Sequence, residues 1–210
     1  MAVFSVSMLG ASLIQIWPTS ITESLGFVSG GICVWLVVRE HMANWPVGLA
    51  NNLVFGVLFW RSRLFADMGL QMLYFGMGVW GWWRWFRGGP DRSRLAISRT
   101  TPLEWMVLLL AIPSVALLLR SLLLVANGAA PWGDSITTAL SLGAQYLLCQ
   151  KRLENWVLWI LADLLYVPLY LSRQLPLTAL LYGVFLILCV AGLRAWRTQW
   201  KRSLLTPSAS

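Results

Sequence analysis

Seven long apolar runs, each bounded by charged residues or by proline, follow one another along the chain. They cover residues 23–40, 43–61, 66–86, 103–126, 134–150, 153–172 and 176–196. An α-helix needs about 20 residues to cross the hydrocarbon core of a bilayer, which is roughly 30 Å thick. The runs therefore predict an all-α integral membrane protein with seven transmembrane helices.

The composition agrees with a chain that is mostly embedded in lipid. Hydrophobic residues make up 58% of the 210 residues, charged residues make up 11%, and the mean hydropathy is +0.68. The net charge of +8 would suit a nucleic-acid-binding protein, but the Lys and Arg residues lie at the ends of the apolar runs instead of forming one stripe. We therefore expect the lipid bilayer as a partner and no nucleic-acid binding.

The two ends of the chain lie outside the seven runs. Residues 1–22 are largely apolar but have no basic start, so we expect a short interfacial segment and not a secretory signal. The C-terminal tail, 198–210, becomes polar and rich in small residues from Lys201. We expect disorder from Lys201 onward.

The basic residues predict the orientation, because cytoplasmic loops carry an excess of Lys and Arg. One side of the runs has only Arg61, Arg63, Arg120 and Arg173. The other side collects Arg39, Arg84, Arg87, Arg92, Arg94, Arg99, Lys151, Arg152, Arg194, Arg197, Lys201 and Arg202. We therefore expect the C-terminus in the cytoplasm and the N-terminus outside.

The sequence also predicts an internal repeat. A shift of 111 residues aligns residues 23–85 with 134–196 without a gap. Chance similarity among apolar helices is the alternative, but matched polar and aromatic pairs favour duplication. The aligned pairs include Asn44 with Asn155, Trp45 with Trp156, Asn52 with Asp163, Gly81 with Gly192 and Trp85 with Trp196.

Each half of the repeat would contain three spans, so a direct fusion would leave the second half inverted. The run 103–126 lies outside the repeat and corrects this. We therefore predict a 3+1+3 arrangement of parallel repeats, with a substrate site between them near the midplane. The expected segments are an interfacial segment (1–22), a first three-helix repeat (23–86), a loop and linker helix (87–130), a second repeat (131–197) and a tail (198–210).

Polar residues inside the spans are the strongest candidates for a ligand site. An Asp at the centre of a transmembrane helix costs about 2.5–3.5 kcal/mol, so Asp163 is expected to face a cavity or a partner. Its span places an aromatic stripe around it at helical spacing, and the stripe comprises Trp156, Trp159, Tyr166 and Tyr170. A helix-packing surface or an interfacial belt is the alternative, above all for Trp156 and Tyr170 near the ends of the span.

The first half has a comparable set of polar residues. Asn51 and Asn52 are central in the second span, and Gln71 and Tyr74 share a face of the third. The second-half partners of that face include Tyr182, Phe185 and Cys189, whereas Asp67 lies near the outer boundary, where it can be hydrated or paired. Aromatic walls with amide and carboxylate groups suit a flat cationic ligand, because a desolvated cation–π contact stabilises by about 2 kcal/mol.

The remaining residues argue against catalysis, cofactors and metals. Cys33, Cys149 and Cys189 lie inside apolar runs and read as small buried hydrophobic residues. The single histidine, His41, lies at a loop boundary, and the sequence has no HExxH, GxSxG or phosphate-binding glycine motif. We expect no enzyme activity and no cofactor, although a membrane-embedded enzyme or a receptor that does not transport its ligand remains an alternative.

Several motifs together resemble the PnuC family of bacterial vitamin transporters. The first half contributes Ala66-Asp67, Leu70-Gln71-x-x-Tyr74 and Gly81-Trp82-Trp83-x-Trp85. The second half contributes Ala144-Gln145, Lys151-x-x-Glu154-Asn155-Trp156-x-x-Trp159-x-x-x-Asp163 and Pro168-Leu169-Tyr170. The resemblance covers essentially the whole membrane domain.

The resemblance implies more than the residue patterns do. It implies a SWEET-like fold, facilitated diffusion, a homotrimer, the bacterial inner membrane and nicotinamide riboside as the cargo, with thiamine or riboflavin as alternatives in related branches. The implied substrate-binding residues are Asn52, Gln71, Trp159, Asp163, Tyr166 and Tyr182, with Asn51, Tyr74 and Gln145 as neighbours.

Overall fold

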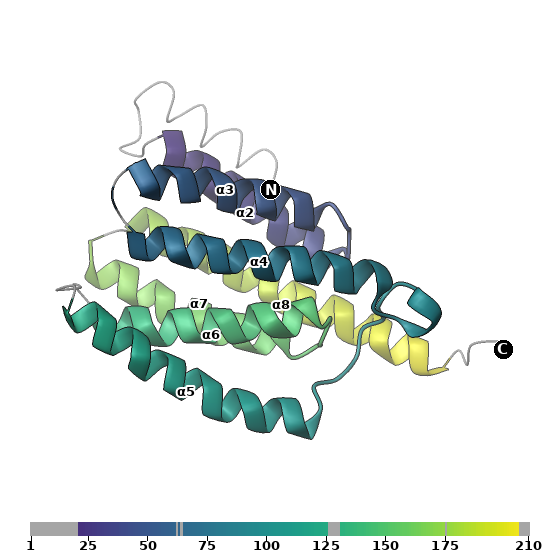
Figure 1. The fold of residues 1–210 in the computed structure, drawn as a ribbon. Helices are drawn as coiled ribbons and strands as arrows, with labels where there is room; N and C mark the ends of the chain where they lie inside the picture. The colour runs from purple at the N-terminus through teal and green to yellow at the C-terminus, as the bar shows by residue number, and fades with distance from the viewer. Residues whose placement is uncertain (1–20, 62, 64, 126–130, 175, 206–210) are drawn as a thin grey trace. The chain divides into compact units, whose positions relative to one another are not determined.

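The described part of the chain is built from α-helices. The computed structural model describes residues 21–61, 63, 65–125, 131–174 and 176–205. Figure 1 shows the helices in chain order: α2 (Ile21–Val38), α3 (Asn44–Arg61), α4 (Phe65–Arg87), α5 (Pro102–Val125), α6 (Pro131–Cys149), α7 (Asn155–Ser172) and α8 (Pro176–Leu205), with a short 3-10 turn η1 (Pro90–Arg92). The all-α prediction is confirmed, and the expected interfacial segment lies outside the described residues apart from the start of α2.

The helix bounds follow the apolar runs closely, with one exception at the C-terminus. Helix α8 continues through Lys201 to Leu205, so the prediction of disorder from Lys201 is wrong for residues 201–205. Between Lys201 and Pro207 the sequence has no glycine or proline that would end the helix. Basic side chains in a last turn also interact favourably with the helix dipole. The ring of Trp200 also lies under the Arg99 guanidinium, 5.4 Å from ring centroid to Cζ.

Local sequence explains where several helices begin. At the start of α5, the Glu104 backbone N–H donates to the Thr101 hydroxyl (3.2 Å), and the Thr101 backbone N–H donates to the Glu104 carboxylate (2.7 Å). This reciprocal pair is a capping box, and Pro102 occupies the first helical position, where no backbone donor is needed. Pro131 and Pro176 likewise occupy the first positions of α6 and α8.

The chain divides into two compact units, Met1–Trp82 and Trp83–Ser210. In the first unit α2 packs against α3, and Gly78 of α4 allows the Leu49 side chain of α3 to approach closely. In the second unit α5, α6, α7 and α8 each pack against the next helix along the chain. The boundary falls within α4, so the last turn of that helix belongs to the second unit.

Tryptophan rings hold the second unit together at one end of its helices. Trp85, Trp156 and Trp196 are all buried. The centroid of the Trp196 ring lies 5.8 Å from that of Trp85 and 5.4 Å from that of Trp156. Gly192 of α8 makes this packing possible, because a Cβ there would lie only 2.5 Å from the Trp156 ring. A second core cluster consists of Leu108, Ala144, Leu147 and Leu158.

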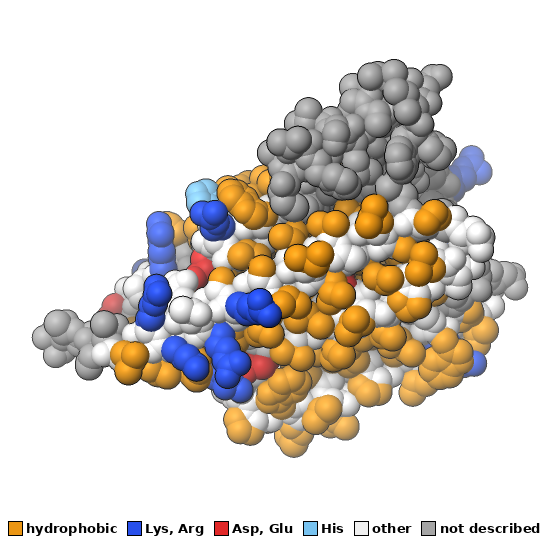
Figure 2. Space-filling view, turned by 180° about the vertical axis from the view of Figure 1, so that it is seen from behind, with side chains coloured by type: hydrophobic (Ala, Val, Ile, Leu, Met, Phe, Trp, Pro, Cys, Tyr) orange, Lys and Arg blue, Asp and Glu red, His pale blue; other side chains and the backbone are white. Residues whose placement is uncertain are grey.

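Many large hydrophobic side chains of the described helices are exposed, and orange side chains cover much of the face seen in Figure 2. Helices α5 and α7 and residues Thr178–Leu205 of α8 are long and apolar enough to cross a membrane, and Val28–Val38 of α2 is a shorter apolar stretch. These segments agree with three of the predicted crossings. For α2, α3, α4 and α6 the helix is present and its passage through the bilayer stays a prediction.

The predicted repeat has a counterpart in the turns of the backbone. Helices α3 (Asn44–Arg61) and α7 (Asn155–Ser172) begin and end at positions separated by the same 111 residues that the sequence alignment uses. The turns before them share a residue with positive φ, Glu40 (52°) in one and Lys151 (53°) in the other. Their backbone hydrogen bonds also correspond, including Glu40 N–H to Val37 O and Lys151 N–H to Leu148 O, both 2.9 Å.

Candidate functional site

Asp163 lies at the centre of α7 and is buried, with 3% of its surface exposed. The Cys189 thiol of α8 donates to its Oδ2 at 3.5 Å, and this is the one hydrogen bond to the carboxylate among the described residues. A thiol is a weak donor. A buried carboxylate normally has a cation or several donors beside it, because burying an uncompensated charge is costly. Among the described residues, no cation forms an ion pair with the Asp163 carboxylate.

Three tyrosine rings cluster in the same α7–α8 seam, which we call the tyrosine cluster: Tyr166, Tyr170 and Tyr182. The ring centroids of Tyr166 and Tyr182 are 4.4 Å apart, and those of Tyr170 and Tyr182 are 5.1 Å apart and nearly parallel. Phe185 meets Tyr182 edge to face at 5.7 Å. Tyr166 is one helical turn from Asp163, so the seam combines a carboxylate with electron-rich ring faces.

The other two predicted residues of the second unit are Trp159, one turn before Asp163 on α7, and Gln145 on α6, and their contacts are with other neighbours. Trp159 is half-buried and packs against the core cluster formed with α5 and α6. Gln145 of α6 is also half-buried, and its side-chain amide lies 3.9 Å from the Cys149 sulfur. The structure therefore brings Asp163, Tyr166 and Tyr182 into one seam and places Trp159 in a packing contact.

The four predicted residues of the first unit are half-buried on α3 and α4. Asn51 donates from its side-chain amide to the Ser29 hydroxyl of α2 at 3.0 Å. Gln71 of α4 lies near Gly56 of α3, and its Cβ is 3.8 Å from the point where a Gly56 Cβ would stand, which is an ordinary van der Waals distance. Asn52 lies beside Asn51, and Tyr74 lies one turn after Gln71. Asp67 is exposed, as expected for a hydrated position at the start of its helix.

Cys189 and Phe185 contact the predicted site residues Asp163 and Tyr182 but are not themselves among the residues predicted from the sequence. The sequence offered one signal for both, because the repeat aligns them with the face of α4 that carries Gln71 and Tyr74. The three cysteines in the chain are free, and Cys149 and Cys189 are buried as predicted, while Cys33 is half-buried. The bond from Cys189 to Asp163 could not be read from the sequence, because it depends on how α7 and α8 face each other.

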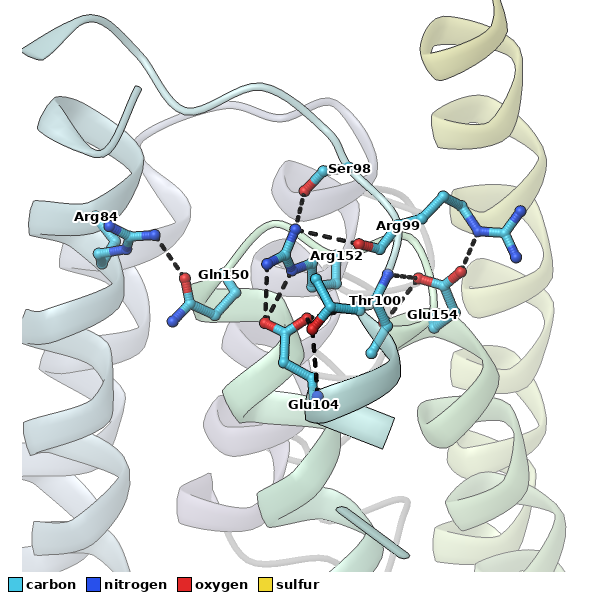
Figure 3. Close-up of polar contacts among 9 residues, drawn as sticks. Arg84, Ser98, Arg99, Thr100, Glu104, Gln150, Arg152 and Glu154 are labelled. Carbon is cyan, nitrogen blue, oxygen red and sulfur yellow. Dashed lines mark hydrogen bonds and ion pairs between the residues drawn. The ribbon is translucent and has the colours of Figure 1, made fainter. Parts of the chain in front are cut away.

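A separate polar network holds the α4–α5 loop against the α6–α7 turn, and Figure 3 shows it. We call it the turn network. The Glu154 carboxylate accepts hydrogen bonds from the Thr100 backbone N–H and the Thr100 hydroxyl, both 2.8 Å, and from Arg99 Nε. The Arg152 guanidinium donates to the Glu104 carboxylate at 2.9 and 3.1 Å and to the Ser98 hydroxyl at 2.7 Å.

The same turn also fixes the last turn of α4. The buried Lys151 ammonium donates to the Leu95 carbonyl at 3.0 Å and lies 4.7 Å from the centroid of the Trp85 ring. Trp85 donates from its indole nitrogen to the Leu148 carbonyl at 2.8 Å. Arg84 donates to the Gln150 side chain at 2.7 Å. These contacts explain why the end of α4 belongs to the second unit.

The charge of Glu154 is stabilised within this network. Burial alone would raise the pKa of Glu154, but the hydrogen bonds from the Thr100 backbone, the Thr100 hydroxyl and Arg99 outweigh it and lower the pKa below the usual 4.5. The carboxylate is thus ionised near neutral pH and can hold the loop.

Comparison with known proteins gives consistent results. The chain is 26% identical over 200 residues to the nicotinamide riboside transporter PnuC of Escherichia coli, covering 83% of this chain and 84% of that protein. It is also 26% identical over 187 residues to the riboflavin/roseoflavin transporter RibM of Streptomyces davaonensis, covering 87% and 85%. Its fold is similar to the crystal structure of the vitamin B3 transporter PnuC, with a TM-score of 0.70 at 24% identity over 96% of this chain and 92% of that one. The profile of the nicotinamide mononucleotide transporter family matches residues 20–198, and the chain belongs to this family of multi-pass membrane transporters.

Proposed function

We propose that the chain carries nicotinamide riboside through the membrane by facilitated diffusion. The observation that supports this cargo most directly is the buried Asp163 carboxylate, which lies next to the tyrosine cluster and whose one hydrogen-bond donor among the described residues is a thiol. Nicotinamide riboside carries its positive charge on a flat pyridinium ring. Such a ring can stack on tyrosine faces while its charge compensates a carboxylate, so each part of the seam has a matching part of the ligand.

The relatives support the same proposal and also provide its main alternative. The relative from Escherichia coli is named for nicotinamide riboside, whereas the relative from Streptomyces davaonensis is named for riboflavin and roseoflavin at the same 26% identity. The flavin ring system is neutral. Riboflavin would therefore use the ring faces of the seam but would leave the Asp163 charge uncompensated, which favours a cationic cargo. Thiamine shares the aromatic cation and is the second candidate on that ground.

Transport itself is tested by uptake into sealed liposomes that contain the purified full chain. Labelled nicotinamide riboside should accumulate to its external concentration with saturable kinetics, without an ion gradient. Uptake equal to that of empty vesicles would contradict transport. A receptor that binds the ligand without transporting it would then be the better interpretation. Uptake that requires an imposed ion gradient would contradict facilitated diffusion.

The cargo is tested by competition. Unlabelled nicotinamide riboside should inhibit the uptake most strongly, thiamine less strongly and riboflavin least, because the ligands share ring faces but differ in charge and shape. If riboflavin were the strongest competitor, the flavin alternative would replace the proposal.

We further propose seven crossings in a 3+1+3, SWEET-like arrangement of parallel repeats, with α5 as the linker between the first repeat (α2–α4) and the second (α6–α8). The corresponding helix bounds and the matching turns at Glu40 and Lys151 support the duplication. Under this proposal Asn51, Asn52, Gln71 and Tyr74 contribute to the same transport pathway as Asp163. Trp159 and Gln145 stay predicted site residues.

The proposed orientation places the N-terminus outside and the C-terminus in the cytoplasm of a bacterial inner membrane. Single cysteines placed in the loop between α4 and α5 should resist an impermeant thiol reagent added to intact cells. Labelling of that loop from outside would reverse the orientation. The homotrimer that the family resemblance implies is tested separately by the mass of the purified protein with its detergent contribution subtracted.

A further inference from the structure

Helix α8 carries one straight line of exposed side chains along its length. Leu180, Ile187, Arg194 and Lys201 are spaced by seven residues, which is close to two full turns of an α-helix. Leu180 is 56% exposed, Ile187 is 70% exposed, and Arg194 and Lys201 are exposed as well. The line is thus apolar in its first half and cationic in its second half. We call it the α8 line.

The opposite side of α8 faces the rest of the second unit. Cys189 and Trp196 lie on that side and are 4% and 0% exposed, and Gly192 between them receives the Trp156 ring. The α8 line is therefore the side of the helix that points away from the core of the second unit. In a membrane protein such a side is available to lipid.

The length of α8 places its cations at the level of lipid headgroups. The helix has 30 residues and is about 45 Å long, whereas the hydrocarbon core is roughly 30 Å thick. Its last residues therefore extend beyond the hydrocarbon. The contact between Trp200 and Arg99 holds this extension against the α4–α5 loop.

Among the described residues, the cations of the α8 line form no ion pair with an acidic side chain. Arg99, Arg152 and Arg173 form ion pairs within the described part of the chain, whereas Arg194, Arg197 and Lys201 form none there. The sequence contains no Asp or Glu after Asp163. Arg197 lies one turn from Arg194 and next to the α8 line, so the three cations form one exposed group without a counter-charge among the described residues.

We propose that the α8 line is a binding site for an anionic phospholipid. The acyl chain lies along Leu180 and Ile187, and the phosphate is bound by Arg194, Arg197 and Lys201. Ile187 and Arg194 are about 10 Å apart along the helix axis, which a single lipid molecule spans easily. An apolar strip that continues directly into uncompensated cations matches the two parts of a phospholipid in the right order. This inference goes beyond the cargo and does not depend on it.

The experiment uses the full chain purified in micelles that contain equal amounts of phosphatidylglycerol and phosphatidylcholine. Lipids that remain bound after exchange into lipid-free detergent are quantified by mass spectrometry. The wild type should retain phosphatidylglycerol several-fold over phosphatidylcholine. Added salt should reduce this preference, because the recognition is between exposed charges. Equal retention of the two lipids by the wild type would overturn the proposal.

Two triple variants separate the α8 line from the general positive charge of the protein. The combination Arg194→Gln, Arg197→Gln and Lys201→Gln should abolish the preference for phosphatidylglycerol. The matched combination Arg87→Gln, Arg92→Gln and Arg94→Gln removes the same charge from the end of α4 and the loop after it, and should keep the preference. Equal losses in both variants, or no loss in the first, would overturn the site.

Two further measurements keep the test decisive. If the first triple variant does not fold, two milder variants replace it. The charge-conserving double variant Arg194→Lys, Arg197→Lys should retain phosphatidylglycerol. The single variant Ile187→Ser should weaken retention of the same lipid. If the first triple variant keeps its lipid but changes the oligomeric state, the α8 line is a contact between copies of the chain and the proposal is wrong.

Discussion

The turn between α2 and α3 and the turn between α6 and α7 have the same backbone but different side-chain contacts. Each contains one residue with positive φ, Glu40 or Lys151, and each is followed by a buried asparagine. Asn44 donates from its side chain to the His41 carbonyl at 2.9 Å, and Asn155 donates to the Arg152 carbonyl at 2.6 Å. The shared asparagine bond explains why the two turns adopt one backbone, because it is made entirely within the turn.

The side chains around this common backbone differ in what they bind. In the second turn Arg152 and Glu154 hold the α4–α5 loop through the turn network. In the first turn the matching positions are His41 and Ala43, and His41 Nδ1 accepts a hydrogen bond from the Ala43 backbone at 3.2 Å. The two turns thus share the backbone geometry that is locally determined, while the side chains of the second turn also bind a loop that is distant in sequence.

The largest effect is expected from Glu154→Ala. The substitution leaves two buried donors of Thr100 without an acceptor and should lower the free energy of unfolding by about 3 kcal/mol. The bond to Arg99 adds little, because that side chain is 59% exposed. Thermal unfolding of the purified protein measures the change. Ala43→Ser at the matching position of the first turn is the control and should have little effect.

The pH dependence provides a second readout for the same carboxylate. Because folding lowers the pKa of Glu154, its stabilisation is fully present above pH 4.5 and is lost as the pH falls through the lower folded value. In Glu154→Gln this part of the acid dependence should be absent. An identical acid profile in wild type and variant would show that Glu154 does not hold the loop as an ionised group.

The next effect concerns the centres of α3 and α7, where the repeat aligns Asn52 with Asp163. Asp163→Asn removes the charge but keeps the size, and should weaken binding of nicotinamide riboside by about 2 kcal/mol, which is roughly thirty-fold. Equilibrium binding to the purified protein measures this, with Asp67→Asn on the exposed start of α4 as the control. Unchanged affinity would assign Asp163 to helix packing.

A smaller effect is expected from Arg152→Gln. Glu104 keeps its bonds from Thr101, so the substitution leaves no buried carboxylate unpaired. Since the Arg152 side chain is 21% exposed, we expect a loss of about 1 kcal/mol in the free energy of unfolding. His41→Gln at the matching position should cost less. A larger loss in His41→Gln would mean that the first turn also depends on its side chain.

The sequence predicted those features of the fold that depend on local pattern. The apolar runs gave the helices because hydrophobic length is a property of each segment, and the repeat predicted that Asn44 and Asn155 occupy equivalent places. The bond between Cys189 and Asp163 and the bond between Thr100 and Glu154 were not predictable. Each joins residues that are distant in sequence (26 and 54 positions) through the packing of two elements. At Lys201 polarity predicts disorder, but the structure continues α8 to Leu205, because a polar sequence can remain helical where a neighbouring side chain such as Trp200 contacts Arg99.

The smallest effect tests whether the two halves share their other turn as well. Gln174, after α7, has φ of 59°, and Arg63, after α3, has φ of 58°. Their backbone N–H groups donate to the carbonyls of Leu171 and Trp60, which correspond in the repeat. Positive φ costs a side-chain-bearing residue about 1 kcal/mol or more, and part of this is offset because glycine loses more entropy on folding. Gln174→Gly should therefore raise the free energy of unfolding by a net amount of about 0.5 kcal/mol, and Arg63→Gly should raise it by a similar amount. If one substitution stabilised the protein and the other destabilised it, the two turns would differ in their side-chain contacts, as the turns at Glu40 and Lys151 do.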